Sequence, residues 1–292
     1  MKFSVREKQN MTGWAFLTPF VILIFLMNFI PIIKAILMSF QTGKTGNMRF
    51  AGFINYARIL EDSKCKDALM VTLEYVVVTV PLIIVLALIL AVLLNDPKLK
   101  LKGIYRTCIF VPAAVSMVAS AVIFRSLFAT DGFVNSVLIQ LGILETGYNF
   151  LGRPVSAKII LMMIRVWKNL GYQMIFYLAA LQSIDISLYE AAKVDGATAL
   201  QRFFKITVPL LKPTLVFTLV MSVNAAIQVY DESVNLTNGG PGNATMPIAH
   251  YIYSLAFGGV PNFGYACALS VIVLIVVGSL TMIQMKAGDR RE

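Results

Sequence analysis

Residues 188–213 read LYEAAKVDGATALQRFFKITVPLLKP and form a polar, charged island between two long apolar segments. The first part predicts one short helix that ends in a turn at Gly196, where a Cβ would obstruct the backbone. Residues 200–206 predict a second short helix with an apolar face, which Pro209 and Pro213 are expected to end. Two small amphipathic helices joined at a glycine, held close to a membrane, suit insertion into a cleft on another protein.

The composition excludes a soluble globular domain. Hydrophobic residues make up 58% of the 292-residue chain and charged residues only 14%, against roughly a quarter charged in soluble domains. The net charge of +10 would suit a nucleic-acid partner, but the Lys and Arg residues are spread through short loops. The sequence therefore predicts an all-α integral membrane protein, with lipid around it and no nucleic acid among its partners.

Six apolar runs are long enough to be membrane-spanning helices. At about 1.5 Å per residue, each crosses a hydrocarbon core of roughly 30 Å with some tilt. The first lacks a small-residue cleavage site, so it is expected to remain as a helix, kinked at Pro19 and Pro31. The six runs cover residues 14–40, 68–94, 104–128, 159–181, 214–230 and 265–285.

The distribution of Lys and Arg predicts the orientation of these helices. With the N-terminus inside, the inner segments carry fourteen Lys and Arg residues and the outer segments carry seven. Positively charged loops prefer the cytoplasm, so both termini and residues 188–213 are expected there. The inner segments are residues 1–13, 95–106, 188–213 and 286–292, and the outer ones are 41–67, 150–158 and 232–264.

Residues 190–209 resemble the cytoplasmic coupling loop of binding-protein-dependent ABC importer permeases. The family pattern is Glu-Ala-Ala, three residues, Gly, nine residues, Ile, one residue and Leu-Pro, and the chain departs from it only in having Val208 where Leu is usual. The resemblance implies a type I importer permease fold with six transmembrane helices and a cytoplasmic coupling helix. It assigns contact with an ATPase to Glu190, Ala191, Ala192, Gly196, Phe203, Phe204, Ile206 and Pro209.

The same resemblance implies a domain organisation and a set of partners. Residues 1–67 would hold the cytoplasmic N-terminus, the first helix and the first external loop, 68–285 a five-helix core, and 286–292 a cytoplasmic tail. The partners would be a second, homologous permease in a heterodimer, two cytosolic ATPase subunits and an extracytoplasmic solute-binding protein. The expected location is the bacterial inner membrane.

No arrangement of residues predicts catalysis or a metal site. Cys65, Cys108 and Cys267 are widely separated, and His250 is the only histidine, best interpreted as a loop residue. Asp231 and Glu232 are adjacent, but neighbouring helical residues point in different directions, which disfavours a shared-proton dyad. We therefore expect no enzyme and no cofactor in this chain, with ATP and Mg on the partner ATPase.

A second resemblance concerns the substrate. Residues 236–241, LTNGGP, followed by Thr245, 251–253 and 256–257, resemble the branch of the family that takes up oligosaccharides, polyols or glycerol phosphates. Asn-Gly-Gly-Pro predicts a tight turn with positive φ. This outer turn either contacts the binding protein or has no role in transport, and the residues concerned are Asn238, Gly239, Gly240 and Pro241.

Polar side chains on two of the expected spans predict a sugar path, because polar groups within a membrane tend to face a cavity. Aromatic rings and amide or carboxylate groups are what carbohydrate recognition requires, and in related maltose-importer permeases these two helices line the cavity. Hydrogen bonding between helices is the alternative role. The residues are Arg165, Lys168, Asn169, Tyr172 and Gln173 on the fourth span, and Ser222, Asn224, Gln228, Tyr230 and Asp231 on or next to the fifth.

Two cations on one helix face leave the charge of the substrate open. Arg165 and Lys168 need neutralisation, either by an anionic substrate such as a uronic-acid oligosaccharide or a glycerol phosphate, or by protein carboxylates such as Asp231. A neutral or mildly acidic oligosaccharide is the favoured substrate. A secondary transporter is the remaining alternative, disfavoured because the sequence shows neither repeated halves nor discontinuous helices.

Overall fold

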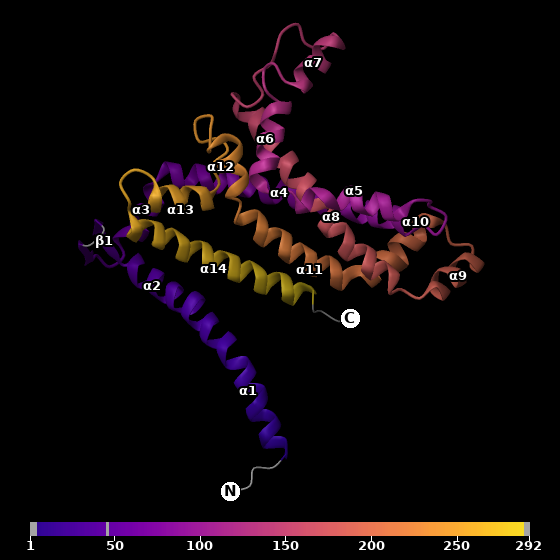
Figure 1. Cartoon of the computed structure of the whole chain (residues 1–292), viewed down its shortest axis with the longest axis horizontal. Coiled ribbons are helices and arrows are strands. Elements are labelled where there is room, and N and C mark those ends of the chain that lie inside the picture. Colours follow the sequence, from indigo (N-terminus) through magenta and orange to yellow (C-terminus); the bar gives the residue numbers. More distant parts are fainter. Residues whose placement is uncertain (1–4, 45–46, 289–292) are drawn as a thin grey trace. The chain divides into compact units, whose positions relative to one another are not determined.

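The computed structural model describes residues 5–44 and 47–288, which are mainly helical. The chain divides into two compact units. One comprises residues up to Asp62 together with Ile252–Ile275, and the other comprises Ser63–Tyr251 together with the residues from Val276 onward. The second unit contains most of the helices, shown in Figure 1.

The first unit begins with a long helix interrupted by a π-helical turn. α1 (Val5–Ile24) leads through a π-helix (Phe25–Phe29) into α2 (Ile30–Ser39). Pro31 follows the π-helical turn directly, and such a turn relaxes the backbone where proline provides no N–H group. Pro19, the other expected kink, lies within the regular α1.

The segment after α2 is ordered, although the sequence predicted only a loop there. Strands β1 (Gln41–Lys44) and β2 (Asn47–Phe50) pair in antiparallel fashion, and α3 (Ile54–Glu61) follows. The buried Asn55 donates from Nδ2 to the backbone carbonyl oxygens of Ser39 and Gln41, each at 2.8 Å. A side-chain amide thus ties the end of α2 to the hairpin.

α3 also contacts the start of α14 (Phe263–Gly288) within the first unit. The Arg58 guanidinium lies 4.6 Å from the centre of the Tyr265 ring, and the Tyr265 hydroxyl donates to Asp62 at 2.6 Å. Gly264 allows the approach, because a Cβ there would lie 1.9 Å from the carbonyl oxygen of Gln41.

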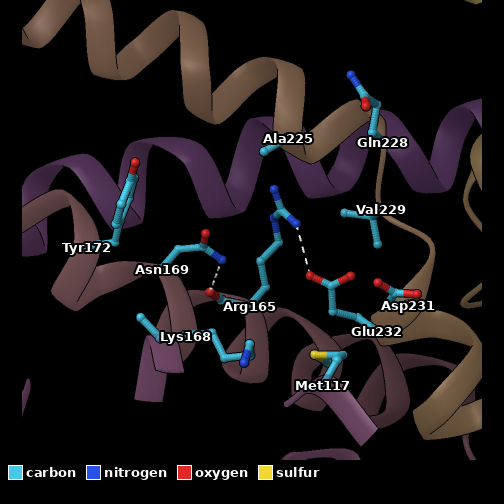
Figure 2. Close-up of a pocket in the computed structure, with 11 residues that line it drawn as sticks. Met117, Arg165, Lys168, Asn169, Tyr172, Ala225, Gln228, Val229, Asp231 and Glu232 are labelled. Atoms are coloured by element: carbon cyan, nitrogen blue, oxygen red, sulfur yellow. Dashed lines mark hydrogen bonds and ion pairs between the residues drawn. The ribbon is translucent and has the colours of Figure 1, made fainter. Parts of the chain in front are cut away.

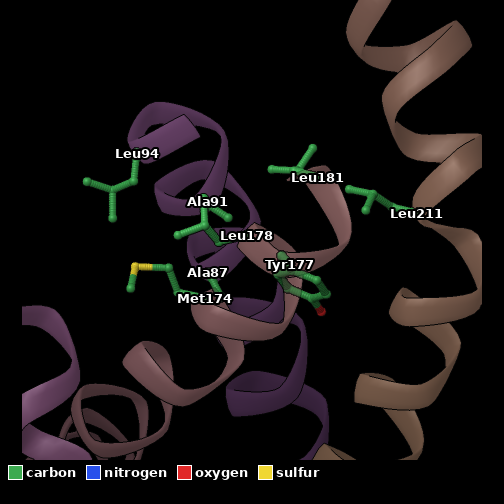
Figure 3. Close-up of a cluster of buried hydrophobic side chains, with 8 residues drawn as sticks. All are labelled: Ala87, Ala91, Leu94, Met174, Tyr177, Leu178, Leu181 and Leu211. Carbon is green, nitrogen blue, oxygen red and sulfur yellow. The ribbon is translucent and has the colours of Figure 1, made fainter. Parts of the chain in front are cut away.

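The second unit is built on α4 (Ser63–Asn95), α8 (Pro154–Gln182) and α11 (Val208–Ile227), which pack against one another (Figure 1). Lipid tails are as apolar as these side chains, so close packing rather than exclusion of water stabilises the contact. Small residues on α4 let α8 approach closely. Figure 3 shows the buried cluster, which consists of Ala87, Ala91, Leu94, Met174, Tyr177, Leu178, Leu181 and Leu211.

The third expected span is broken, so the prediction of one helix over residues 104–128 is wrong. α5 (Lys102–Ala114) and α6 (Met117–Leu127) meet at an angle of 100°. Val115 and Ser116 have extended backbone, and the Ser116 side chain caps α6 by accepting a hydrogen bond from the Ala119 N–H. The chain therefore contains a discontinuous helix, and the absence of such helices no longer counts against a secondary transporter.

The prolines after the predicted coupling loop do not end a helix, which corrects a second expectation. Helical structure continues from α10 (Ala199–Arg202) through a π-helix (Phe203–Thr207) into α11. Pro209 lies just after the π-helical turn, and such a turn relaxes the backbone where proline provides no N–H group. Pro213 lies within α11.

Among the described residues, four helical segments are long and apolar enough to cross a membrane, and the bent α5–α6 pair would make a fifth span. The four are 11–39, 63–95, 199–227 and 263–288. These five agree with five of the six predicted spans. The remaining one, 159–181, is part of α8, whose 29 residues are long enough but include several charged and polar side chains.

Candidate functional site

A pocket of about 460 Å³ opens in the second unit where α8, the α5–α6 break and the end of α11 meet α12 (Asp231–Thr237). α11 ends at Ile227, three residues before the end of the predicted span, and the chain turns through Gln228 and Tyr230 into α12. The pocket is lined by Ala113, Met117, Arg165, Lys168, Asn169, Tyr172, Ala225, Gln228, Val229, Asp231 and Glu232 (Figure 2).

A buried ion pair forms one wall of the pocket. The Arg165 side chain extends from α8 toward Glu232 on α12, and Nη1 donates to Oε1 at 3.1 Å (Figure 2). The two side chains are only 5% and 14% exposed. A buried charged pair interacts more strongly than it would in water. Removing either partner would leave the other as an unpaired buried charge.

Lys168 binds backbone carbonyl groups at the break between α5 and α6. Its Nζ donates to the carbonyl oxygen of Pro112 at 3.3 Å and to that of Val115. These carbonyl groups lie at the C-terminal end of α5, where the helix leaves acceptors without intrahelical donors and carries partial negative charge. The lysine therefore caps the C-terminal end of α5.

The remaining polar groups face the pocket more freely. Asn169 donates from Nδ2 to the Arg165 carbonyl oxygen at 2.8 Å, which leaves its side-chain oxygen available as an acceptor. Tyr172 is 48% exposed and packs edge-on against Phe176. Gln228 and Asp231 are exposed. Together they present amide, carboxylate and aromatic groups.

Four of the residues predicted for the sugar path lie outside this pocket. Gln173 and Ser222 are buried in a hydrogen-bonded network between α8 and α11, where Gln173 Nε2 donates to Ser222 Oγ. The Asn224 side chain accepts from Thr281 at 3.3 Å, and Tyr230 packs edge-on against His250. These four side chains therefore contact neighbouring helices and do not line the pocket.

Glu232 was not predicted as a site residue, although a signal for it existed. A cation such as Arg165 within a membrane helix needs a counter-ion. The predicted counter-ion was Asp231, which is the neighbour of Glu232. The choice between adjacent residues depends on the rotation of α12, which is set by the turn at 228–230. Sequence reasoning treated that turn as part of a continuous span.

α12 is held at both ends. Besides the Arg165–Glu232 pair, Arg125 on α6 donates from Nε to the carbonyl oxygen of Leu236 at 2.6 Å. The next residues, Asn238 and Gly239, have φ values of +50° and +80°, which confirms the predicted tight turn. Asn238 is exposed, whereas a Cβ at the buried Gly239 would lie 2.8 Å from the Met246 side chain.

A buried polar cluster supports the turn at residues 238–241. Ser233 Oγ donates to the Thr245 carbonyl oxygen at 2.6 Å and lies 2.9 Å from His250 Nδ1, on α13 (Ile248–Phe257). Thr245 Oγ1 donates to the Gly240 carbonyl oxygen at 2.7 Å. His250 is therefore part of a hydrogen-bonded cluster, and its burial lowers the pKa of the imidazole.

The predicted coupling loop contains α9 (Ile186–Val194) and α10, joined at Gly196. Gly196 has φ of +76°, and the N–H groups of Gly196 and Ala197 donate to the carbonyl oxygens of Lys193 and Ala192. These two bonds form a Schellman motif, which needs a left-handed residue and favours glycine. The predicted turn at Gly196 is confirmed, although α9 ends before Ala197.

Internal contacts hold the two arms of this loop in place. Tyr189 Oη lies 2.9 Å from Thr207 Oγ1, and Arg202 Nη1 donates to the Ala197 carbonyl oxygen at 2.9 Å. At the start of α9, a hydrogen bond from the Ser187 N–H lowers the pKa of the Asp185 carboxyl group. Of the residues predicted to meet an ATPase, Ala192, Phe203 and Ile206 are half-buried, whereas the exposed ones are Glu190, Ala191, Gly196, Phe204 and Pro209.

Residues 63–291 match the family model described as the inner membrane component of binding-protein-dependent transport systems. The chain belongs to this family. The match includes every residue of the pocket and of the coupling loop. The permease therefore has the importer fold that the motif at residues 190–209 implied.

Relatives and solved structures match the permease over nearly its whole length. A lactose transport system permease protein of Rhizobium radiobacter is 40% identical over 99% of this chain and 98% of that relative. A trehalose/maltose transport system permease protein of Thermococcus litoralis is 31% identical over 98% and 97%. A chain of a bacterial ABC transporter involved in importing the acidic polysaccharide alginate has a TM-score of 0.86 at 26% identity, covering 97% and 96%.

Proposed function

We propose that this permease passes an oligosaccharide from an extracytoplasmic binding protein into the cytoplasm, as the membrane subunit of an ATP-driven importer. The observation that carries the proposal is the polar pocket of about 460 Å³ among apolar helices. Its volume falls within the roughly 300–1,000 Å³ of small-molecule sites. The names of the relatives, which include lactose and trehalose/maltose permeases, support a sugar as the substrate.

The pocket chemistry suits carbohydrate hydroxyl groups. The Asn169 and Gln228 amides and the Asp231 carboxylate offer acceptors and donors, and the exposed Tyr172 ring offers a surface for sugar C–H groups. We propose Arg165 and Lys168 as residues that shape this pocket through their bonds to Glu232 and to the end of α5. Gln173, Ser222, Asn224 and Tyr230 then support the helices around it.

The energy for transport would come from other subunits. We propose a second permease and two cytosolic ATPase subunits that bind ATP and Mg, with residues 188–213 inserted into a cleft on one ATPase. Val194 and Phe204, 88% and 61% exposed, supply apolar contacts, and Glu190 supplies a charged one. The hydrogen bonds across the loop let it move as one body when the ATPases close.

The orientation follows from the charge distribution. With both termini cytoplasmic, residues 188–213 face the ATPases and the turn at 238–241 faces the binding protein. The family description places its members in the inner membrane, which agrees with this arrangement. On the outer side, the exposed Asn238 and the half-buried Gly240 and Pro241 are available for contact, whereas Gly239 shapes the turn.

The proposal is tested in two steps. Affinity purification from native membranes in a mild detergent, followed by mass spectrometry, should recover an ATPase and a second permease. The assembly is then reconstituted in proteoliposomes with its binding protein outside, and uptake of radiolabelled lactose, maltose and maltotriose is measured with and without internal ATP. ATP-dependent uptake of a sugar is the expected result. Recovery of this chain alone in several detergents, with uptake independent of ATP, would instead favour a secondary transporter.

A further inference from the structure

We propose that the pocket selects uncharged sugars and excludes sugars that carry a carboxylate or phosphate group. This inference rests on the proposed function, and it concerns the charge of the substrate. Two cations and two carboxylates line the pocket, so its formal charge is balanced before any substrate enters. The way these four groups are paired decides which of them can meet a ligand.

The charge of Arg165 is already neutralised within the protein. Glu232 accepts its Nη1 hydrogen bond, and the guanidinium side chain is 95% buried, as its 5% exposure shows. The Nε atom is buried and has no hydrogen-bond partner among the described residues, and burial keeps it away from a ligand. An anionic sugar that drew Arg165 away from Glu232 would leave that carboxylate, only 14% exposed, without its partner.

The ammonium group of Lys168 is committed to backbone oxygens. Its bonds to the carbonyl groups of Pro112 and Val115 satisfy the end of α5 at the break. Withdrawing Lys168 toward a substrate anion would cost the Val115 carbonyl oxygen its donor, whereas the Pro112 carbonyl oxygen would keep its bond from the Val115 N–H. Two of the three N–H bonds of the ammonium group thus hold Lys168 at the break, which disfavours its movement toward a substrate anion.

Asp231 is the charged group that remains. Its residue is exposed at the pocket, and its carboxylate makes no ion pair with any residue in the described part of the chain. A carboxylate accepts hydrogen bonds from sugar hydroxyl groups and repels an anion. The pocket thus offers an acceptor for neutral sugars and a barrier to charged ones.

The test measures direct binding to the purified transporter in nanodiscs without binding protein, so that the selectivity of the binding protein does not enter. Lactose and maltose are each compared with the same disaccharide oxidised to a carboxylate at C6 of the non-reducing sugar. Saturation-transfer NMR with competition titrations gives relative affinities. We expect the neutral sugars to bind at least about tenfold more tightly than their carboxylates.

Two variants test whether the Asp231 carboxylate causes the selectivity for neutral sugars. Asp231→Asn removes the exposed carboxylate and should raise relative affinity for the carboxylate sugars about three- to tenfold. Glu74→Gln is the matched control, because Glu74 belongs to the Lys158–Glu74 ion pair, which does not line the pocket. It should leave the affinity ratio unchanged.

The outcomes separate this inference from the proposed function. Carboxylate sugars that bind as well as or better than neutral ones, with ATP-dependent uptake intact, overturn the inference alone. An unchanged ratio in Asp231→Asn also overturns the assignment to that residue. If no sugar binds and no ATP-dependent uptake of any sugar occurs, the proposed function fails and the inference fails with it.

Discussion

A Cβ placed on Gly171 would lie 2.1 Å from the carbonyl oxygen of Ile109, so α8 and α5 touch backbone to backbone. This contact lies one turn from Lys168, which caps the end of the same α5. Small residues allow membrane helices to approach this closely. The position of the pocket wall therefore depends on the absence of a side chain at Gly171.

Gly171→Val should separate these helices. The added atoms overlap backbone that cannot move aside easily, so we expect a loss of about 1–3 kcal/mol of stability or more. Unfolding in a mixed-detergent titration, followed by circular dichroism, measures this loss. Gly103→Ala on α5 is the control, because a Cβ there has no atom within 4 Å. Equal stability of the two variants would contradict the close contact.

Glu232→Gln should destabilise the permease more than Glu74→Gln does. Removing Glu232 leaves the buried Arg165 without its counter-ion, at a cost of about 3–5 kcal/mol. The Lys158–Glu74 pair is 24% and 37% exposed, so its loss should cost about 1 kcal/mol or less. The same detergent titration compares the two.

A double variant distinguishes the stability lost with the ion pair from the stability lost because Arg165 is left as an unpaired buried charge. Arg165→Met combined with Glu232→Gln removes both charges, so it should recover part of the stability lost in Glu232→Gln alone. If the double variant is as unstable as the sum of the single changes, the two residues do not act as a pair.

Gly196→Ala should impair transport without preventing membrane insertion. A left-handed backbone costs a residue with a Cβ about 1–2 kcal/mol, which favours rearrangement of the turn between α9 and α10. Uptake in proteoliposomes and ATPase activity are measured together. Gly196→Asn should retain more uptake than Gly196→Ala, because Asn tolerates this conformation better. The reverse order would show that backbone conformation is not the reason glycine stands there.

Glu190→Lys tests the proposed contact with the ATPase. Reversing the charge should reduce uptake tenfold or more, because loss of one partner of a buried charge pair across an interface costs about 2–5 kcal/mol. ATP hydrolysis should lose its dependence on the binding protein. Asp195→Lys is the matched control, since Asp195 is also exposed in this loop and stands at a variable position of the family motif. Unchanged uptake in Glu190→Lys would contradict the contact.

The cluster around His250 should weaken in acid. Burial lowers the pKa of His250 below its ordinary value of 6.5, so the unfolded segment binds more protons than the folded one at acidic pH. The stabilising effect of the neutral imidazole is present above pH 6.5 and is lost as the pH falls toward the folded pKa. Hydrogen exchange of residues 233–250 at pH 7.5 and 5.5 measures this, and His250→Gln should remove the additional acid sensitivity.

The sequence predicted those features that depend on residue type and local order. The spans follow from apolar composition, and the turns at Gly196 and Asn238–Gly239 follow from residues that tolerate positive φ. The breaks were harder to predict. Residues 104–128 are mostly apolar, and the serine cap at Ser116, with its bond from Ala119, lies at the 100° bend.

The pocket was predicted in part, for a physical reason. Arg165, Lys168, Asn169 and Tyr172 share a helix face at spacings of three and four, which periodicity detects. Their partners are set by tertiary structure, because Glu232 follows a turn and the Pro112 and Val115 carbonyl groups are exposed only by a break. Whether Gln173 faces a cavity or a neighbouring helix likewise depends on packing that spacing does not encode.

α12 connects the pocket to the turn at residues 238–241 through a helix of seven residues, about 10 Å long at 1.5 Å per residue. Glu232 lies at one end, and Asn238 caps the other. Because an α-helix rotates about 100° per residue, inserting one residue between Ser233 and Leu236 would turn the two ends out of phase without changing any side chain at either. The rotation of the turn at 238–241 relative to the pocket thus depends on the number of residues in α12, so the length of this helix is as fixed a requirement as the identity of its residues.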